Sequence, residues 1–320
     1  MESHFDLVVL INFFITRMQS DIFKIDLKNS GYLIIENYFS SDFFNNDLHN
    51  FLITAPNFSD GVINSIPQPF MAGISQRIKS IIPDLAKALD LKIALNRFAY
   101  CAIRIDKSTS DPQLKKPFNY HQDPKVAPGG VLNWHIDHYS YYLHKDHTNW
   151  LICYIPIFKP SKELANLAIV PTDVVKQHDP YLHQQIQGRG AMRFRCAEAD
   201  TMDWFELRFP DQSIKVGDWF AIDDYNDSSP GFKLNIDLEA HKVVPKLEVG
   251  DLLIMRADVI HRTHDAGTDR ISVRCDAIPL NAARLDTWLG LIWLSLQYPF
   301  MGAKRRYNIG KWLHKEWNNR

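Results

Sequence analysis

A histidine and an aspartate two residues apart are the first side chains of this sequence that could do chemistry together. His135 and Asp137 lie in the stretch 133–138, which reads Asn-Trp-His-Ile-Asp-His. Residues two apart on an extended strand leave the same face, so both side chains would point the same way. An imidazole nitrogen beside a carboxylate oxygen provides two of the ligands that borderline divalent metal ions take from proteins. The pair therefore predicts most of a metal site.

A second imidazole much later in the chain could complete this site. His261 follows an apolar stretch at 251–255 and a short polar turn, and His264 competes with it for the same role. Two histidines and one carboxylate on one face of a metal, with the other positions open, form the facial arrangement of non-haem Fe(II) oxygenases. Our leading hypothesis is that His135, Asp137 and His261 bind Fe(II).

Other His-x-Asp pairs compete with His135 and Asp137, since a chain with 13 histidines produces such pairs by chance. The favoured pair is preceded and separated by apolar residues, as expected where one face of a strand packs in the core. His121 and Asp123 lie among prolines and glycines typical of a loop, and they remain the alternative. The two further pairs are His4 with Asp6 and His144 with Asp146.

Three polar residues near the end of the predicted core alternate with apolar ones. Arg270, Ser272 and Arg274 would therefore share one face of a strand. Facing the interior, two guanidinium groups would be costly without an anionic partner. A dicarboxylate held end-on by Arg270, with a second hydrogen bond from Ser272, is a sensible ligand. Arg274 could support Arg270 or bind an acidic group of a substrate, and Trp134 is a further candidate contact. The alternative is an edge strand whose arginines lie in water.

The elements that would position these residues are mostly strands. Helical spacing of apolar residues predicts a helix over 74–89, which Pro83 could split into two. Helices that precede many strands favour a mainly β core with helices laid against it. Strands are predicted at 32–35, 97–105, 150–158, 167–170, 251–255 and 271–278.

The whole chain, 1–320, is read as one domain. A helical part over about 1–94 precedes the core of about 95–280, and a helical segment over 281–320 follows it. The stretch 172–245 is an insertion with four short predicted strands, and it either forms a lid or substrate pocket or extends the sheets. The apolar stretch 286–301 is expected in the core or between copies of the chain in a homo-oligomer.

Composition excludes several classes of protein. The chain has 46% hydrophobic and 23% charged residues, a formal net charge of -1 and a pI of about 6.9. These values indicate a globular protein without the overall field that recruits nucleic acid or an acidic membrane. Four scattered cysteines are typical of a reduced, cytoplasmic protein, and the apolar run 7–15 is too short to span a bilayer.

Taken together, these pieces resemble the Fe(II)/2-oxoglutarate-dependent dioxygenases, particularly the phytanoyl-CoA dioxygenase-like branch. The resemblance covers about 28–280 and fails over 172–245. The Gly-Ser-His usual in the branch does not follow Pro171 here, which leaves the substrate open. The similar stretches are 30–40, 166–171, Gly250-Asp251, His261-Arg262-Thr263 and Arg270-Ile271-Ser272.

This resemblance implies a fold and a reaction. The fold is a double-stranded β-helix, the jelly roll of cupins, with His135, Asp137 and His261 holding Fe(II) at its open end. Arg270 and Ser272 would bind the far carboxylate of 2-oxoglutarate, and O2 would oxidise a small-molecule substrate with release of succinate and CO2. A carboxylate at position 137 argues against halogenation.

Two other functions stay open. Residues 135–138 partly match a zinc hydrolase motif, although Asn133 replaces its leading histidine. A cupin-like binding protein without turnover is the other alternative.

Overall fold

A computed structural model provides the structure of this chain. It describes residues 26–40, 43–44, 50, 62–63, 68–89, 95–105, 118–119, 134–136, 151–186, 192–194, 206–207, 216, 219–222, 232–264, 268 and 270–279. The predicted segments at 7–15, 281–320 and 286–301 lie outside these residues, and so does Asp137.

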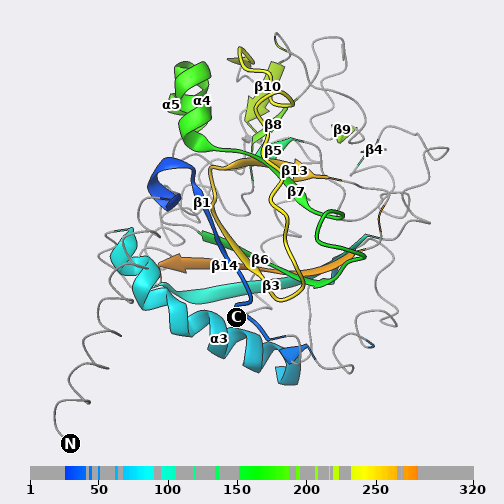
Figure 1. Cartoon of the computed structure of the whole chain (residues 1–320). Helices are drawn as coiled ribbons and strands as arrows, with labels where there is room; N and C mark the ends of the chain where they lie inside the picture. Colours follow the sequence, from blue (N-terminus) through cyan, green and yellow to red (C-terminus); the bar gives the residue numbers. More distant parts are fainter. Residues whose placement is uncertain are drawn as a thin grey trace, which may run out of the picture.

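Two six-stranded sheets, with antiparallel pairing throughout, make up most of the described structure (Figure 1). The mainly β architecture with added helices is confirmed. The first sheet has the order β1 (Tyr32–Ile35), β12 (Leu252–Arg256), β6 (Leu151–Phe158), β14 (Arg270–Pro279), β3 (Leu95–Ile105) and β2 (Val62–Ile63). The second has the order β11 (Phe232–Lys233), β10 (Trp219–Ile222), β8 (Met192–Phe194), β5 (His135–Ile136), β13 (Ile260–Thr263) and β7 (Leu167–Val170). A third, two-stranded sheet joins β4 (Phe118–Asn119) to β9 (Glu206–Leu207).

One helix covers the outer face of the first sheet. In Figure 1, α3 (Gln68–Ala88) lies beneath β3 and β14. Its apolar residues at helical spacing, Ile74 and Ile78 among them, share a buried cluster with Val273 of β14. Pro83 does not split the predicted helix, since α3 is continuous through that residue. Pro83 is on the exposed side of the helix, so apolar packing continues both before and after it.

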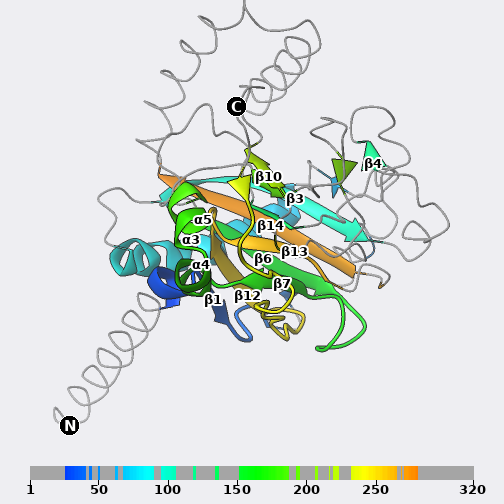
Figure 2. The same cartoon turned by 90° about the horizontal axis from the view of Figure 1, so that it is seen from above.

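A second apolar cluster lies between the two sheets, which lie one above the other in Figure 1 and overlap when seen from above in Figure 2. It joins Ile152 and Tyr154 of β6 to Leu167 and Ile169 of β7. The alternate residues of β6, such as Cys153, belong instead to the cluster between α3 and the first sheet. Since β6 is buried on both faces, its sequence is a continuous apolar run without alternation. Among the described residues, Cys153 and Cys275 are buried in the core.

Two short helices cover the outer face of the second sheet. They are α4 (Thr172–His178) and α5 (Pro180–Ile186), and both pack with Leu234, Ile236 and Leu238 against β5, β7 and β13. Between the helices Asp179 accepts a hydrogen bond from the Leu182 amide at 3.0 Å, which caps α5, and one from the Asn235 amide at 2.9 Å. None of the described helices has the length and apolar character to cross a membrane.

Part of the predicted insertion belongs to the second sheet. Strands β8, β10 and β11 lie within three of the short strands predicted for this stretch, at 191–197, 214–222 and 232–238, and β8 pairs directly with β5. In the described residues, strands of this segment therefore extend the sheet that carries His135.

A glycine at a tight approach joins β1 to β12. Gly250 has φ +96°, and a Cβ there would lie 2.4 Å from the Phe39 carbonyl oxygen. Beside it, the Asp251 carboxylate accepts hydrogen bonds from the Asn37 and Glu248 amides, each at 2.8 Å. The Gly-Asp pair thus has a structural role that requires both residue types.

Candidate functional site

The structure brings two of the predicted metal ligands together. His135 of β5 lies directly opposite His261 of β13 in the register of the second sheet. Their ring centroids are 4.4 Å apart and the ring planes are tilted by 48°. The residues are only 6% and 5% exposed, so the two imidazoles lie in a largely dry environment.

Both histidines face the first sheet. Their neighbours Trp134, Ile136 and Ile260 belong to the cluster on the outer face, beneath α4 and α5. Because side chains alternate along a strand, His135 and His261 point to the inner face. Ile169, the other register partner of His261, is part of the cluster between the sheets.

One hydrogen bond determines how the ring of His261 can act. Its Nδ1 lies 2.9 Å from the Val259 carbonyl oxygen. Since a carbonyl only accepts, Nδ1 carries the proton and donates. In the neutral ring, Nε2 then has a lone pair, and a backbone carbonyl behind the other nitrogen is a usual support of a metal-bound histidine. His261 is therefore prepared to ligate through Nε2.

The remaining ligand candidates are less defined. No group of three His, Cys, Asp or Glu residues that could hold a metal occurs within the described part of the chain. Asp137 is outside that part, as are the competing pairs at 4–6, 121–123 and 144–146. His264 follows β13, and its backbone amide donates to the Asn166 carbonyl at 3.1 Å.

Arg270 connects the two sheets. Its guanidinium donates through Nη1 to the Asn166 carbonyl at 2.8 Å and through Nη2 to the His264 carbonyl. These carbonyls flank the start of β7 and the end of β13, whereas Arg270 itself begins β14. Arg270 is 3% exposed, and β14 lies between β6 and β3. The alternative of an edge strand in water was therefore wrong.

Ser272 and Arg274 follow Arg270 on the inner face of β14. In the register with β6, Ser272 lies opposite Pro156 and Arg274 opposite Tyr154, a member of the cluster between the sheets. The intervening residues Ile271 and Val273 face the other way and belong to the cluster between α3 and the first sheet. The described candidates on the inner faces of the two sheets are thus His135, His261, Arg270, Ser272 and Arg274.

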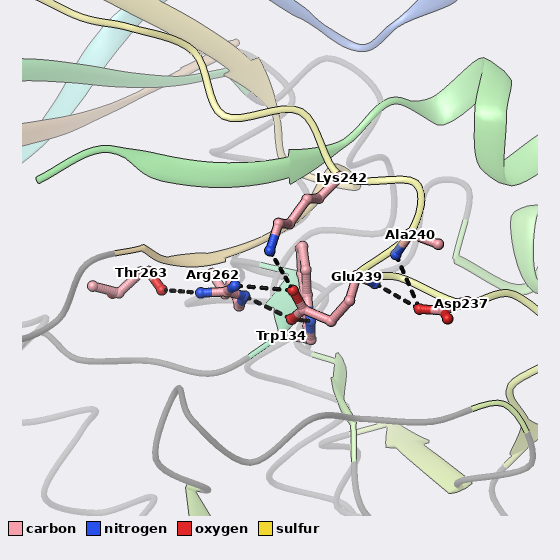
Figure 3. Close-up of polar contacts among 7 residues, drawn as sticks. All are labelled: Trp134, Asp237, Glu239, Ala240, Lys242, Arg262 and Thr263. Atoms are coloured by element: carbon pink, nitrogen blue, oxygen red, sulfur yellow. Dashed lines mark hydrogen bonds and ion pairs between the residues drawn. The ribbon is translucent and has the colours of Figure 1, made fainter. Parts of the chain in front are cut away.

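Trp134 lies on the opposite face from the histidines. Its indole Nε1 donates to Glu239 Oε1 at 2.8 Å, and the Arg262 guanidinium lies 5.2 Å from the ring centroid (Figure 3). Arg262 also donates to Glu239 through Nε at 3.0 Å and through Nη2 at 3.1 Å. The structure does not bring Trp134 into contact with the space that the histidines face.

Glu239 is ionised in this cluster. Burial alone would raise the pKa of its carboxyl, but hydrogen bonds from Arg262, Lys242 and Trp134 and the charge of Arg262 outweigh burial and lower that pKa from 4.5 to about 2. Sequence reasoning missed Glu239 because it belongs to a turn without periodicity. Alternation from His135 and His261 could have placed Trp134 and Arg262 together on the outer face.

No protein-family model matches the chain, and no curated protein matches it. The chain is similar to the crystal structure of the non-heme alpha ketoglutarate dependent epimerase SnoN from nogalamycin biosynthesis (TM-score 0.43, 10% identity, 82% of this chain and 84% of that one). It is also similar to a Pseudomonas putida prolyl-4-hydroxylase (0.42, 9%, 81% and 98%). A third similar structure is EctD from S. alaskensis with 2-oxoglutarate and 5-hydroxyectoine (0.42, 12%, 81% and 76%). Likeness of this size carries no argument about the site, which rests on the residues of this chain.

Proposed function

We propose that this chain is an Fe(II)- and 2-oxoglutarate-dependent oxygenase that oxidises a small molecule with O2 and releases succinate and CO2. The observation that carries the proposal is the pair of buried imidazoles, His135 and His261, set opposite each other on the inner face of one sheet. In this proposal the two sheets form a double-stranded β-helix of the phytanoyl-CoA dioxygenase-like kind.

The donor set suits ferrous iron. His261 presents Nε2 because its Nδ1 is engaged by the Val259 carbonyl. Asp137 follows His135 by two residues in the sequence, and an extended chain would direct its carboxylate to the same side. Two imidazoles and one carboxylate leave positions open for a cosubstrate and O2.

Arg270 is the proposed anchor for the cosubstrate. Two backbone carbonyls hold its guanidinium in one orientation, and a guanidinium matches the geometry of a carboxylate. Ser272, on the same face of β14, would donate a second hydrogen bond. The far carboxylate of 2-oxoglutarate would thus be held by the first sheet while its other end reaches the metal on the second.

The remaining contribution of the protein is orientation and exclusion of water. When bound, iron and 2-oxoglutarate supply the oxidising chemistry, which no side chain could supply alone. The inner faces of both sheets carry buried apolar residues beside the site, such as Ile169 and Tyr154. A dry environment strengthens the interactions of Arg270 with an anion and protects the reaction from water.

Succinate release tests this function. Purified protein with Fe(II), ascorbate and 2-oxoglutarate should release succinate slowly even without a primary substrate, and a substrate library should then be screened for faster release. His135→Ala and His261→Ala should each abolish succinate release and stoichiometric iron binding. The matched control is His178→Ala, which alters an exposed histidine at the end of α4.

Two outcomes would contradict the proposal. The first is the absence of metal-dependent succinate under every condition, and the second is full iron binding by both site variants. Binding of iron and 2-oxoglutarate without turnover of any compound would indicate the non-catalytic binding protein instead.

A further inference from the structure

The residues next to the two histidines also meet each other, on the outer face of the second sheet. Trp134 precedes His135, and Arg262 follows His261. Since β5 and β13 are antiparallel with His135 opposite His261, Trp134 and Arg262 face each other across the same two strands. The guanidinium carbon of Arg262 lies 5.2 Å from the centroid of the Trp134 ring. Trp134 and Arg262, the outer pair, therefore lie on the opposite face of β5 and β13 from the two histidines.

A single carboxylate binds both members of this outer pair. Glu239 accepts hydrogen bonds from Trp134 Nε1 at 2.8 Å and from Arg262 Nε and Nη2 at 3.0 and 3.1 Å. Lys242 Nζ adds a further contact at 2.6 Å. Arg262 is 5% exposed, so its charge is buried, whereas the Glu239 side chain is 27% exposed. Figure 3 shows all these donors converging on the Glu239 carboxylate.

The turn that carries Glu239 is itself fixed. The Asp237 carboxylate accepts hydrogen bonds from the Glu239 and Ala240 amides, each at 3.0 Å. A few residues later Val243 exchanges two backbone hydrogen bonds with Ile169 of β7, at 2.7 and 2.8 Å. Because β7 pairs with β13, the turn is tied to the same sheet that carries the histidines.

Backbone pairing alone gives β5 little support. Within the described residues it is two residues long, its register with β13 consists of the single pair of His135 and His261, and its register with β8 adds two pairs. A slip of one residue in a strand moves every side chain to the opposite face. Such a slip would bring Ile136 or Trp134 to the inner face and remove His135 from it.

We propose that Glu239 is a positioning residue for the metal site: by binding Trp134 and Arg262 together, it holds β5 in register with β13, so that His135 and His261 stay at a spacing that one metal ion can bridge. The ion is the one in the proposed function, on which this role rests. Glu239 touches neither histidine and acts only through their neighbours.

The test combines a metal-free measurement with a metal-binding one. The first follows the side-chain nitrogen resonances of His135 and His261 in the metal-free protein by NMR. The second is a titration with Co(II) alone, whose absorption spectrum reports the ligands. Glu239→Gln keeps the shape of the side chain and removes its charge. Asp179→Asn is the control, since Asp179 is a buried carboxylate between α4 and α5, where it accepts hydrogen bonds from the Leu182 and Asn235 amides.

We expect Glu239→Gln to shift or broaden both histidine resonances and to weaken Co(II) binding by about 10-fold or more, the usual effect of losing a supporting group behind metal ligands. Glu239→Asp should recover part of this loss. Asp179→Asn should lower the melting temperature without changing either measurement. If Glu239→Gln does not fold, Trp134→Phe removes one donor to Glu239 and should produce a smaller change in the same direction.

Three outcomes would overturn the positioning role. The first is that Glu239→Gln changes neither the histidine resonances nor the Co(II) affinity. The second, if Glu239→Gln does not fold, is that Trp134→Phe changes neither of them. The third is that Asp179→Asn loses as much Co(II) affinity as Glu239→Gln. If the wild-type protein binds no Co(II) through its histidines, the proposed function fails, and the resonances of the metal-free variants then decide the role of Glu239 by themselves.

Discussion

At the scale of single residues, the candidate site contains side chains whose orientation is fixed by hydrogen bonds to the protein itself. His261 donates from Nδ1 to the Val259 carbonyl, so in the neutral ring the lone pair is on Nε2. Arg270 uses two guanidinium nitrogens on backbone carbonyls and is thereby held in one orientation. Glu239 engages both of its oxygens with side chains from three positions. Each group is oriented before any ligand arrives, which lowers the entropic cost of binding.

The charge of Glu239 predicts a specific dependence of stability on pH. Its pKa is lowered from 4.5 to about 2 in the folded protein, so its ionised form stabilises the fold above about pH 4.5, and this contribution is lost as the pH falls toward 2. Urea unfolding of the metal-free wild type and of Glu239→Gln should therefore differ most above pH 4.5, by about 1–2 kcal/mol once solvent screening of the partly exposed carboxyl is allowed for. The difference should shrink toward pH 2. Glu163→Gln, at an exposed carboxyl, is the control, and a pH-independent difference for Glu239→Gln would contradict the prediction.

At the scale of elements, tight backbone approaches fix β1 and β12, which are not the strands that carry the candidate residues. Gly31 and Gly250 both have positive φ, at +82° and +96°. Gly31 precedes β1, and a Cβ there would meet Val259 and Thr172; Gly250 precedes β12, and a Cβ there would meet Phe39. These contacts bring β1 and the start of α4 close to Val259, which supports the ring of His261. The geometry of the site thus depends on backbone positions distant from it in the sequence.

Replacement of Gly250 by alanine tests the connection between β1 and β12. The new Cβ would lie 2.4 Å from a backbone oxygen at a φ that side chains rarely adopt, so both the clash and the conformation are costly. We expect the free energy of unfolding to fall by about 2 kcal/mol or more, measured by urea denaturation. Gly73→Ala inside α3 is the control, because its Cβ would meet only a movable Phe43 side chain at 3.2 Å. If Gly250→Ala were as stable as the wild type, the close approach and the positive φ at position 250 would not require glycine.

Element by element, sequence reasoning succeeded where periodicity was strong. The strands at 32–35 and 167–170 and the dense apolar run of β6 were predicted because their burial determines their composition. Pro83 misled because its position on the exposed side of α3 depends on packing that the sequence alone does not contain. The two residues of β5 are too short for any periodic signal, so His135 had to be recognised from its chemistry.

The site was predictable only in part for a related reason. The inward set on β14 follows from alternation of polar and apolar residues, and both histidines followed from their metal-binding chemistry. Glu239, in contrast, is brought to Trp134 and Arg262 by a turn, and no spacing rule connects position 239 to 134. Likewise, the partners of Arg270 are backbone carbonyls, which any sequence would provide.

At the scale of the whole molecule, the two sheets meet through apolar packing and through Arg270. The cluster between them joins β6 and β12 to β7, while Arg270 reaches from β14 to the ends of β7 and β13. The proposed metal site lies on the second sheet and the proposed carboxylate anchor on the first. A ligand that contacts both would therefore link the sheets and stabilise the molecule as a whole.

Thermal unfolding under anaerobic conditions tests this link. Co(II) alone should raise the melting temperature of the wild type, and 2-oxoglutarate with Co(II) should raise it further, since a ligand at about 100 times its Kd contributes about 2.7 kcal/mol. Arg270→Ala should melt at a lower temperature, because it loses the bonds to Asn166 and His264. It should keep the increment from Co(II) and lose the one from 2-oxoglutarate, whereas His261→Ala should lose both. If Arg270→Ala keeps the 2-oxoglutarate increment and Arg274→Ala loses it, the anchor is Arg274. If both variants keep it, the cosubstrate does not link the sheets through β14.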